Sequence, residues 1–127
     1  PTSTGAATAI GKVLPSLDGK LSGGALRVPV PDGSLIDLSL ELTEKVTEDE
    51  INSAFMNRDD GVTLRATFDP IVSSDVIGTT YGAIVDLSLT KVLEVDGKQM
   101  IKVVAWYDNE MGYSAQMVRT AKKYLER

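Results

Sequence analysis

The first seven residues combine features that suit binding of a small anion. Thr4 and Gly5 stand where a helix is predicted to begin, among hydroxyl side chains and free backbone N–H groups. The first N–H groups of a helix have no partner within the helix, and the helix dipole adds positive potential there. The segment is therefore a candidate phosphate site. An ordinary Ser or Thr helix cap has the same sequence, and this segment alone favours the cap.

Arg27 is a second candidate for anion binding, because residues 25–29 carry no other charge. A guanidinium group can hold two phosphate oxygens through parallel hydrogen bonds. A partly buried structural ion pair is an equally good interpretation of the same residue. The sequence leaves both interpretations open.

A third candidate site lies at residues 106–113, where a predicted strand ends and a predicted helix begins. Rigid elements on both sides of such a junction would aim its side chains across a cleft. Asn109 offers both a donor and an acceptor through its amide. The alternative is that Asp108 or Asn109 only caps the helix while Trp106 and Tyr107 pack in the core. From the residues alone, that alternative is favoured.

The chain contains neither cysteine nor histidine. Their absence excludes disulfides, thiolate and imidazole metal ligands, thiol nucleophiles and the usual general base at neutral pH. Carboxylates alone serve a few enzymes, but most acyl-transfer and oxidoreductase sites need one of the missing groups. We therefore expect no catalytic residue and no metal site in this chain.

The charge balance argues against polyanionic partners. Thirteen Lys and Arg residues against eighteen Asp and Glu residues give a net charge of -5, which disfavours nucleic acid and anionic membrane but permits a local anion site. No apolar run approaches the ~20 residues that span a bilayer, and the first residues resemble neither a signal peptide nor a natural initiator. We expect a cytoplasmic chain that was cut from a longer one.

Apolar spacing and turn residues predict the first elements. A helix is expected from about Gly5 to Leu14, because apolar residues recur at helical spacing and a proline follows. Alternation of apolar and polar residues predicts a strand over 35–42. The Pro-Asp-Gly turn before it indicates a hairpin with residues 25–30.

The middle of the chain carries a capping box at residues 47–50, which predicts a helix that runs to about Asn57. A strand is expected next, near residues 62–66. Two long strands, 82–95 and 98–107, are then expected to form a hairpin through an Asp-Gly turn.

An amphipathic helix is expected after Asp108. The order of these elements predicts an α+β fold. Its sheet would be mostly antiparallel, with helices covering one face.

Five short motifs, taken in order, resemble signatures of the phosphorylating glyceraldehyde-3-phosphate dehydrogenases. The resemblance covers essentially the whole chain, and it departs from the family pattern at Thr8, Met111 and residues 78–82. None of these departures is a candidate site residue. The motifs are Pro-Thr-Ser-Thr-Gly-Ala-Ala at 1–7, Gly-Lys-Val-Leu-Pro at 11–15, Leu-Arg-Val-Pro at 26–29, Val-Ser-Ser-Asp at 72–75 and Trp-Tyr-Asp-Asn-Glu at 106–110.

The resemblance implies a place for this chain in a larger enzyme. In that family a cysteine thiolate attacks an aldehyde with a histidine as base, hydride passes to NAD, and inorganic phosphate cleaves the resulting thioester. The chain resembles the part of those enzymes that lies after the cysteine and the histidine. Residues 1–127 would thus be the C-terminal portion of the catalytic domain, and the NAD-binding Rossmann domain and the Cys/His segment would lie upstream.

The same resemblance assigns roles to the candidates. Thr4 and Gly5 match positions that bind the attacking phosphate, and Arg27 matches the arginine that holds substrate phosphate groups. Asn109 matches the residue that bonds the nicotinamide carboxamide, and Tyr113 matches an aromatic neighbour of that ring. The parent enzyme would use NAD, glyceraldehyde 3-phosphate and inorganic phosphate. The fragment alone is expected to bind no cofactor and to be inactive.

Two alternatives remain: a fragment of erythrose-4-phosphate dehydrogenase, whose distinguishing residues lie mainly upstream, and a non-catalytic interaction module. A natural reading frame that continues upstream through a cysteine-containing strand would favour the enzyme. In the resembling family catalytic domains pair sheet against sheet in a homotetramer, so we expect self-association, most simply as a two-fold dimer. The apolar residues expected to need a partner are Leu35 and Ile84 on the sheet and Met117, Val118, Ala121 and Leu125 on the last helix.

Overall fold

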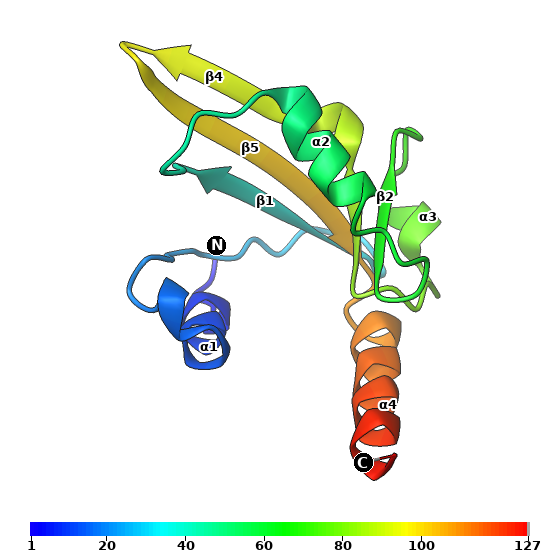
Figure 1. The fold of residues 1–127 in the computed structure, drawn as a ribbon. Coiled ribbons are helices and arrows are strands. Elements are labelled where there is room, and N and C mark those ends of the chain that lie inside the picture. Colours follow the sequence, from blue (N-terminus) through cyan, green and yellow to red (C-terminus); the bar gives the residue numbers. More distant parts are fainter. Residues whose placement is uncertain (127) are drawn as a thin grey trace. The chain divides into compact units, whose positions relative to one another are not determined.

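The computed structural model describes residues 1–126, which form two compact units (Figure 1). The first unit is Pro1–Val30, and the second begins at Pro31. The candidate phosphate residues belong to the first unit, and Asn109 and Tyr113 belong to the second.

Helix α1, Ala6–Val13, dominates the first unit, and a short 3-10 turn, Pro15–Leu17, follows it. The predicted helix is confirmed, and Pro15 occupies the first turn of the new element, where its missing N–H costs nothing. Thr2 and Ala25 exchange backbone hydrogen bonds of 2.9 and 3.0 Å. This bridge ties the start of the unit to its last segment.

The predicted hairpin between residues 25–30 and 35–42 is wrong. Residues 26–30 form no strand, and strand β1, Ser34–Leu40, pairs with a strand far along the chain. Pro29 and Pro31 each lack the N–H donor that a ladder needs. The N–H of Val30 bonds to the carbonyl of Val28 at 2.9 Å, so the backbone turns instead of extending.

The second unit is built on a five-stranded sheet in the order β1-β5-β3-β2, with β4 also paired to β5. Strands β1, β3 and β4 are antiparallel to β5, and only β2 and β3 are parallel. The mostly antiparallel α+β fold is thereby confirmed. The further bounds are β2 Leu64–Thr67, β3 Ala83–Asp86, β4 Lys91–Val95 and β5 Lys98–Tyr107.

The long strand predicted over 82–95 is broken in two. After β3 the chain makes a 3-10 turn, Leu87–Leu89, before β4 begins. The carboxylate of Asp86 accepts hydrogen bonds from the Ser88 backbone N–H at 3.2 Å and from its hydroxyl at 2.6 Å, which stabilises the turn. The hairpin between β4 and β5 is confirmed: Asp96 and Gly97 have φ of 51° and 77°, as a type I′ turn requires.

Helix α2, Glu48–Met56, covers one face of the sheet (Figure 1). Ile51 and Phe55 of this helix pack against a buried cluster made by β3, the following turn and β5. The predicted capping box is present. The Thr47 hydroxyl accepts from the Glu50 N–H at 3.2 Å, and the Glu50 carboxylate accepts from the Thr47 N–H at 2.8 Å. The members of the buried cluster are Val85, Leu87, Ile101 and Val103.

Two more helices complete the second unit. The short α3, Ser73–Val76, had no helical signal in the sequence, and it carries most of the motif at 72–75. Helix α4, Met111–Leu125, confirms the amphipathic helix and runs from the end of β5 away from the sheet (Figure 1). At 15 residues it is the longest helix of the described chain. No helix within residues 1–126 has the length and apolar character needed to cross a membrane.

The capping box gives a direct test of what starts α2. Replacing Thr47 by Ala removes the acceptor for the Glu50 N–H, so we expect the free energy of unfolding to fall by about 1 kcal/mol. Chemical denaturation monitored by circular dichroism measures the change. Thr43→Ala, at an exposed position outside the helix, is the matched control and should leave the unfolding midpoint unchanged. Equal effects of the two substitutions would contradict the assigned cap.

Candidate functional site

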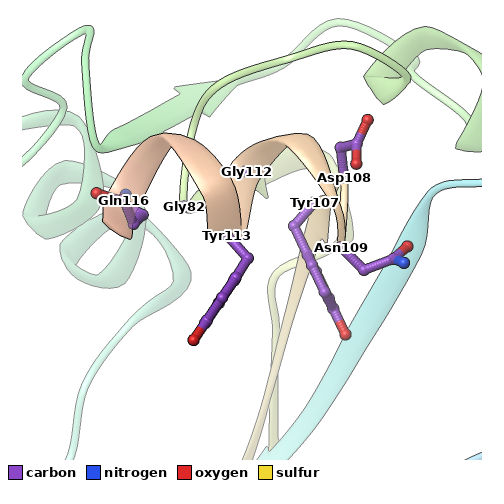
Figure 2. A pocket seen from close by; sticks show the side chains of 7 residues that line it. All are labelled: Gly82, Tyr107, Asp108, Asn109, Gly112, Tyr113 and Gln116. Carbon is purple, nitrogen blue, oxygen red and sulfur yellow. The ribbon is translucent and has the colours of Figure 1, made fainter. Parts of the chain in front are cut away.

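A cavity of about 250 Å³ opens where β5 ends and α4 begins (Figure 2). Figure 2 shows the rings of Tyr107 and Tyr113 projecting to one side of this junction, while the Asp108 carboxylate points to the other. The walls of the cavity come from the last residue of β5, the residues that connect it to α4, the first turns of α4 and the residue just before β3. The lining residues are Gly82, Tyr107, Asp108, Asn109, Gly112, Tyr113 and Gln116.

Asp108 holds the junction together. Its side chain is only 2% exposed, and its carboxylate accepts from the backbone N–H groups of Gly78 at 2.8 Å, Glu110 at 2.9 Å and Met111 at 2.7 Å. The N–H of Gly78, followed by that of Met111, lowers the pKa of Asp108 below its ordinary value, although burial opposes this shift. The residue therefore caps α4, as the simpler interpretation of the sequence held, and also anchors a loop thirty positions away.

Two glycines allow the first turns of α4 to approach the chain before β3. Gly112 is buried, and a Cβ atom there would lie 2.6 Å from the Tyr81 carbonyl oxygen. At Gly82 a Cβ atom would lie 2.5 Å from Nε2 of Gln116. A side chain at Gly112 would force the two segments apart because it meets backbone, whereas one at Gly82 would first displace the flexible Gln116 side chain. Sequence reasoning missed both; for Gly112, a glycine inside a helical pattern was the available signal.

The structure brings Asn109 and Tyr113 together on the wall of this cavity. Both side chains are exposed, so both are accessible to a ligand. Oδ1 of Asn109 accepts a hydrogen bond from the Ser34 hydroxyl at 3.1 Å. Ser34 was missed by the sequence analysis, because the predicted pairing of its strand with residues 25–30 hid its position opposite Tyr107.

The candidate phosphate residues lie in the first unit, where all three are exposed. Gly5 is the N-cap of α1, and the Thr4 hydroxyl accepts a long hydrogen bond, 3.3 Å, from the Ala6 N–H. The Thr2–Ala25 bridge joins the segment before Thr4 to the segment before Arg27.

Within residues 1–126, no hydrogen bond joins Arg27 to Thr4 or Gly5, and no ion pair involves Arg27. Both interpretations of Arg27 stay predictions. In the same described range, no group of three or more His, Cys, Asp or Glu side chains has a geometry that would hold a metal ion.

Asp108→Asn tests the anchoring carboxylate. The amide keeps one oxygen acceptor and directs N–H donors toward backbone N–H groups, so we expect a loss of about 1–3 kcal/mol of stability at neutral pH. Because the folded pKa of Asp108 is lowered, its contribution is complete above the unfolded pKa of about 3.9 and is lost as the pH falls through the folded pKa.

The measurement is urea denaturation of both proteins between pH 2 and pH 7. The free energy of unfolding of the original chain should fall as the pH drops. The variant should lack the part of this fall that protonation of Asp108 causes. Glu110→Gln, which removes the exposed neighbouring carboxylate, is the control and should keep that decline. Identical acid profiles for Asp108→Asn and the original chain would contradict the assigned role.

Comparison with known proteins identifies the family to which this sequence is similar. The sequence profile for "Glyceraldehyde 3-phosphate dehydrogenase, C-terminal domain" matches residues 1–109. The glyceraldehyde-3-phosphate dehydrogenase of Streptococcus pyogenes is 56% identical over 126 residues, which are 99% of this chain and 37% of that protein.

Two further relatives carry the same protein name. The Streptococcus dysgalactiae subsp. equisimilis protein is 54% identical over 126 residues, 99% of this chain and 37% of its own length. The Clostridium acetobutylicum protein is 53% identical over 120 residues, 94% of this chain and 36% of its own length. The chain therefore spans little more than a third of the relatives that it matches.

Proposed function

This chain belongs to the family of glyceraldehyde 3-phosphate dehydrogenase C-terminal domains, and we propose that it is the C-terminal part of an NAD-dependent glyceraldehyde-3-phosphate dehydrogenase of glycolysis, working in the cytoplasm. Its contribution is binding and positioning, since it has no thiol and no imidazole to act as nucleophile or base. The observation that carries the proposal is the cavity shared by Asn109 and Tyr113.

The groups around this cavity fit a nicotinamide ring. A primary amide such as that of Asn109 has both a donor and an acceptor, and so does the carboxamide of nicotinamide. The Tyr113 ring, 71% exposed, offers a flat apolar wall beside it. When bound, NAD accepts the hydride removed from the aldehyde substrate. In this proposal Asn109 bonds the carboxamide and so sets which face of the ring meets the substrate.

The first unit is proposed to hold phosphate groups of glyceraldehyde 3-phosphate and inorganic phosphate. The helix start at Thr4 and Gly5 contributes ~0.3–1 kcal/mol, and charged hydrogen bonds from Arg27 contribute ~1.5–3 kcal/mol. Millimolar binding already requires about -4 kcal/mol. The three residues therefore make a marginal site by themselves and need the rest of the enzyme for useful affinity.

The activity is tested in a chimera in which this chain replaces the matching segment of the Streptococcus pyogenes relative. We expect NAD-dependent oxidation of glyceraldehyde 3-phosphate that requires phosphate. Arg27→Ala should raise the KM for phosphate roughly 10- to 150-fold, the equivalent of losing ~1.5–3 kcal/mol of charged hydrogen bonding. Asn109→Ala should raise the KM for NAD.

Lys20→Ala removes a charge from the same unit as Arg27 and is the control, with no expected change in KM. The isolated chain should show no turnover, and turnover that resists thiol-blocking reagents would contradict the binding-only role. Erythrose 4-phosphate serves as a second substrate: a preference for it would assign the chain to that dehydrogenase instead.

Self-association is the second part of the proposal, with a homotetramer for the parent enzyme and a dimer for this chain. Val92 pairs with Ile101 on the face that α2 covers, so the neighbouring pair Leu93 and Met100 points to the opposite face. Leu93 and Met100 are 62% and 60% exposed. Such a pair of apolar side chains supports the proposal that this face meets a partner.

The expectation for Ile84 is wrong: it is only 8% exposed and is already covered within the chain. Leu35 remains 42% exposed, as expected for a residue that needs a partner. The apolar stripe of the last helix is also exposed, including Met117, Val118 and Leu125. The exposed Leu93 and Met100 and the exposed stripe of α4 are therefore two alternative contact surfaces.

Sedimentation equilibrium at micromolar concentration tests this association. We expect a monomer–dimer equilibrium above the monomer mass of 13.6 kDa, because burying exposed apolar area favours association. Leu93→Lys with Met100→Lys should yield monomer, whereas Val118→Lys on α4 should leave the dimer intact. A single species at the monomer mass at every concentration would refute self-association, and loss of the dimer only in Val118→Lys would move the contact to α4.

A further inference from the structure

The hydrogen bond between the Ser34 hydroxyl and Oδ1 of Asn109 joins residues 75 positions apart. The distance between the two oxygens is 3.1 Å. Ser34 is half-buried and is not among the residues that line the cavity. Its one side-chain partner within residues 1–126 is the residue proposed to bind the nicotinamide.

Ser34 is held at a fixed position by its backbone. It is the first residue of β1 and lies opposite Tyr107, the last residue of β5. Gly33 before it has φ of +84°, which an L-residue with a side chain rarely adopts. A Cβ atom on Gly33 would also lie 2.6 Å from the carbonyl oxygen of Ser73. The Asp32 carboxylate accepts from the Gly33 N–H at 2.7 Å and completes the turn.

The backbone around Asn109 is fixed as well, whereas its side chain would be free to rotate without the bond to Ser34. The Asp108 carboxylate binds the N–H groups of Glu110 and Met111, on the far side of Asn109. The Asn109 side chain itself is exposed. The terminal torsion of an asparagine is broad, so an exposed amide without a partner samples many orientations. A bond from a hydroxyl whose backbone is held in place restricts that rotation.

We propose that Ser34 is a positioning residue that orients the amide of Asn109 for its ligand. The hydroxyl donates to Oδ1, which leaves the second lone pair of Oδ1 and the Nδ2 protons for a ligand carboxamide. The orienting contact stands on the hydrogen bond alone, and its consequence for NAD rests on the proposed function. Ser34 touches no ligand in this scheme, and it acts only through Asn109.

The first experiment measures the conformation of the Asn109 side chain in the 127-residue chain by NMR. Three-bond couplings from the backbone N and C′ atoms to Cγ of Asn109 report whether χ1 keeps one rotamer, and NOEs from the two Nδ2 protons report the orientation of the amide about χ2. We expect one rotamer in the original chain and in Ser34→Thr, which keeps a hydroxyl, and averaged couplings in Ser34→Ala. Ser39→Ala, on the same strand but opposite Lys102, is the control and should change nothing. Couplings that stay the same in Ser34→Ala would overturn the proposal.

The second experiment measures the consequence in the chimera. Loss of one neutral hydrogen bond predicts a KM for NAD roughly 2- to 10-fold higher in Ser34→Ala, restored in Ser34→Thr. Because Ser34 acts through Asn109, Ser34→Ala should add nothing to Asn109→Ala. Additive effects of the two substitutions would overturn the proposal.

The two experiments separate this proposal from the cofactor role of Asn109. Changed couplings in Ser34→Ala together with an unchanged KM for NAD in Asn109→Ala would support the orienting contact and refute the cofactor role. A raised KM in Asn109→Ala with unchanged couplings in Ser34→Ala would keep the cofactor role and refute the orienting contact.

Discussion

Strand β5 is the constraint on which the second unit depends, because every other antiparallel strand pairs with it. Strand β1 lies along one edge of β5, while β4 and β3 follow each other along the other edge. Ten residues of continuous extended backbone are needed for this arrangement. The side chains of β5 alternate, so Ile101 and Val103 fill the core under α2 while Met100 faces the opposite side. The end of β5 then becomes the place where the site is built.

The buried carboxylate of Asp108 turns that strand end into a rigid corner. An unpaired buried charge would be strongly unfavourable, yet three backbone N–H groups satisfy this one. Two of them belong to the start of α4, where the helix dipole also favours a negative charge. The third belongs to Gly78, so strand, loop and helix meet at one side chain. The positions of Asn109 and Tyr113 therefore depend on these contacts of Asp108.

The side-chain types present in the chain limit the chemistry that it is able to perform. Hydroxyls, a guanidinium, an amide and a phenol ring bind and orient ligands, whereas a thiolate and an imidazole, which the chain lacks, make and break bonds. The relatives are almost three times as long as this chain, which covers 37% of the first of them. The proposed function, with binding groups here and reacting groups elsewhere in the enzyme, fits both observations.

Local features of the fold were determined by the sequence itself. The α2 capping box, the Asp96-Gly97 turn and the periodicity of α4 act within a few residues, so the residue types alone indicate the structure. Five ordered motifs likewise indicated the family. Only the tertiary structure decided the partner of β1 and the contacts of Ser34 and Asp108. These contacts join residues that are distant in the sequence, and local patterns carry no information on which distant group satisfies a backbone ladder or a side chain.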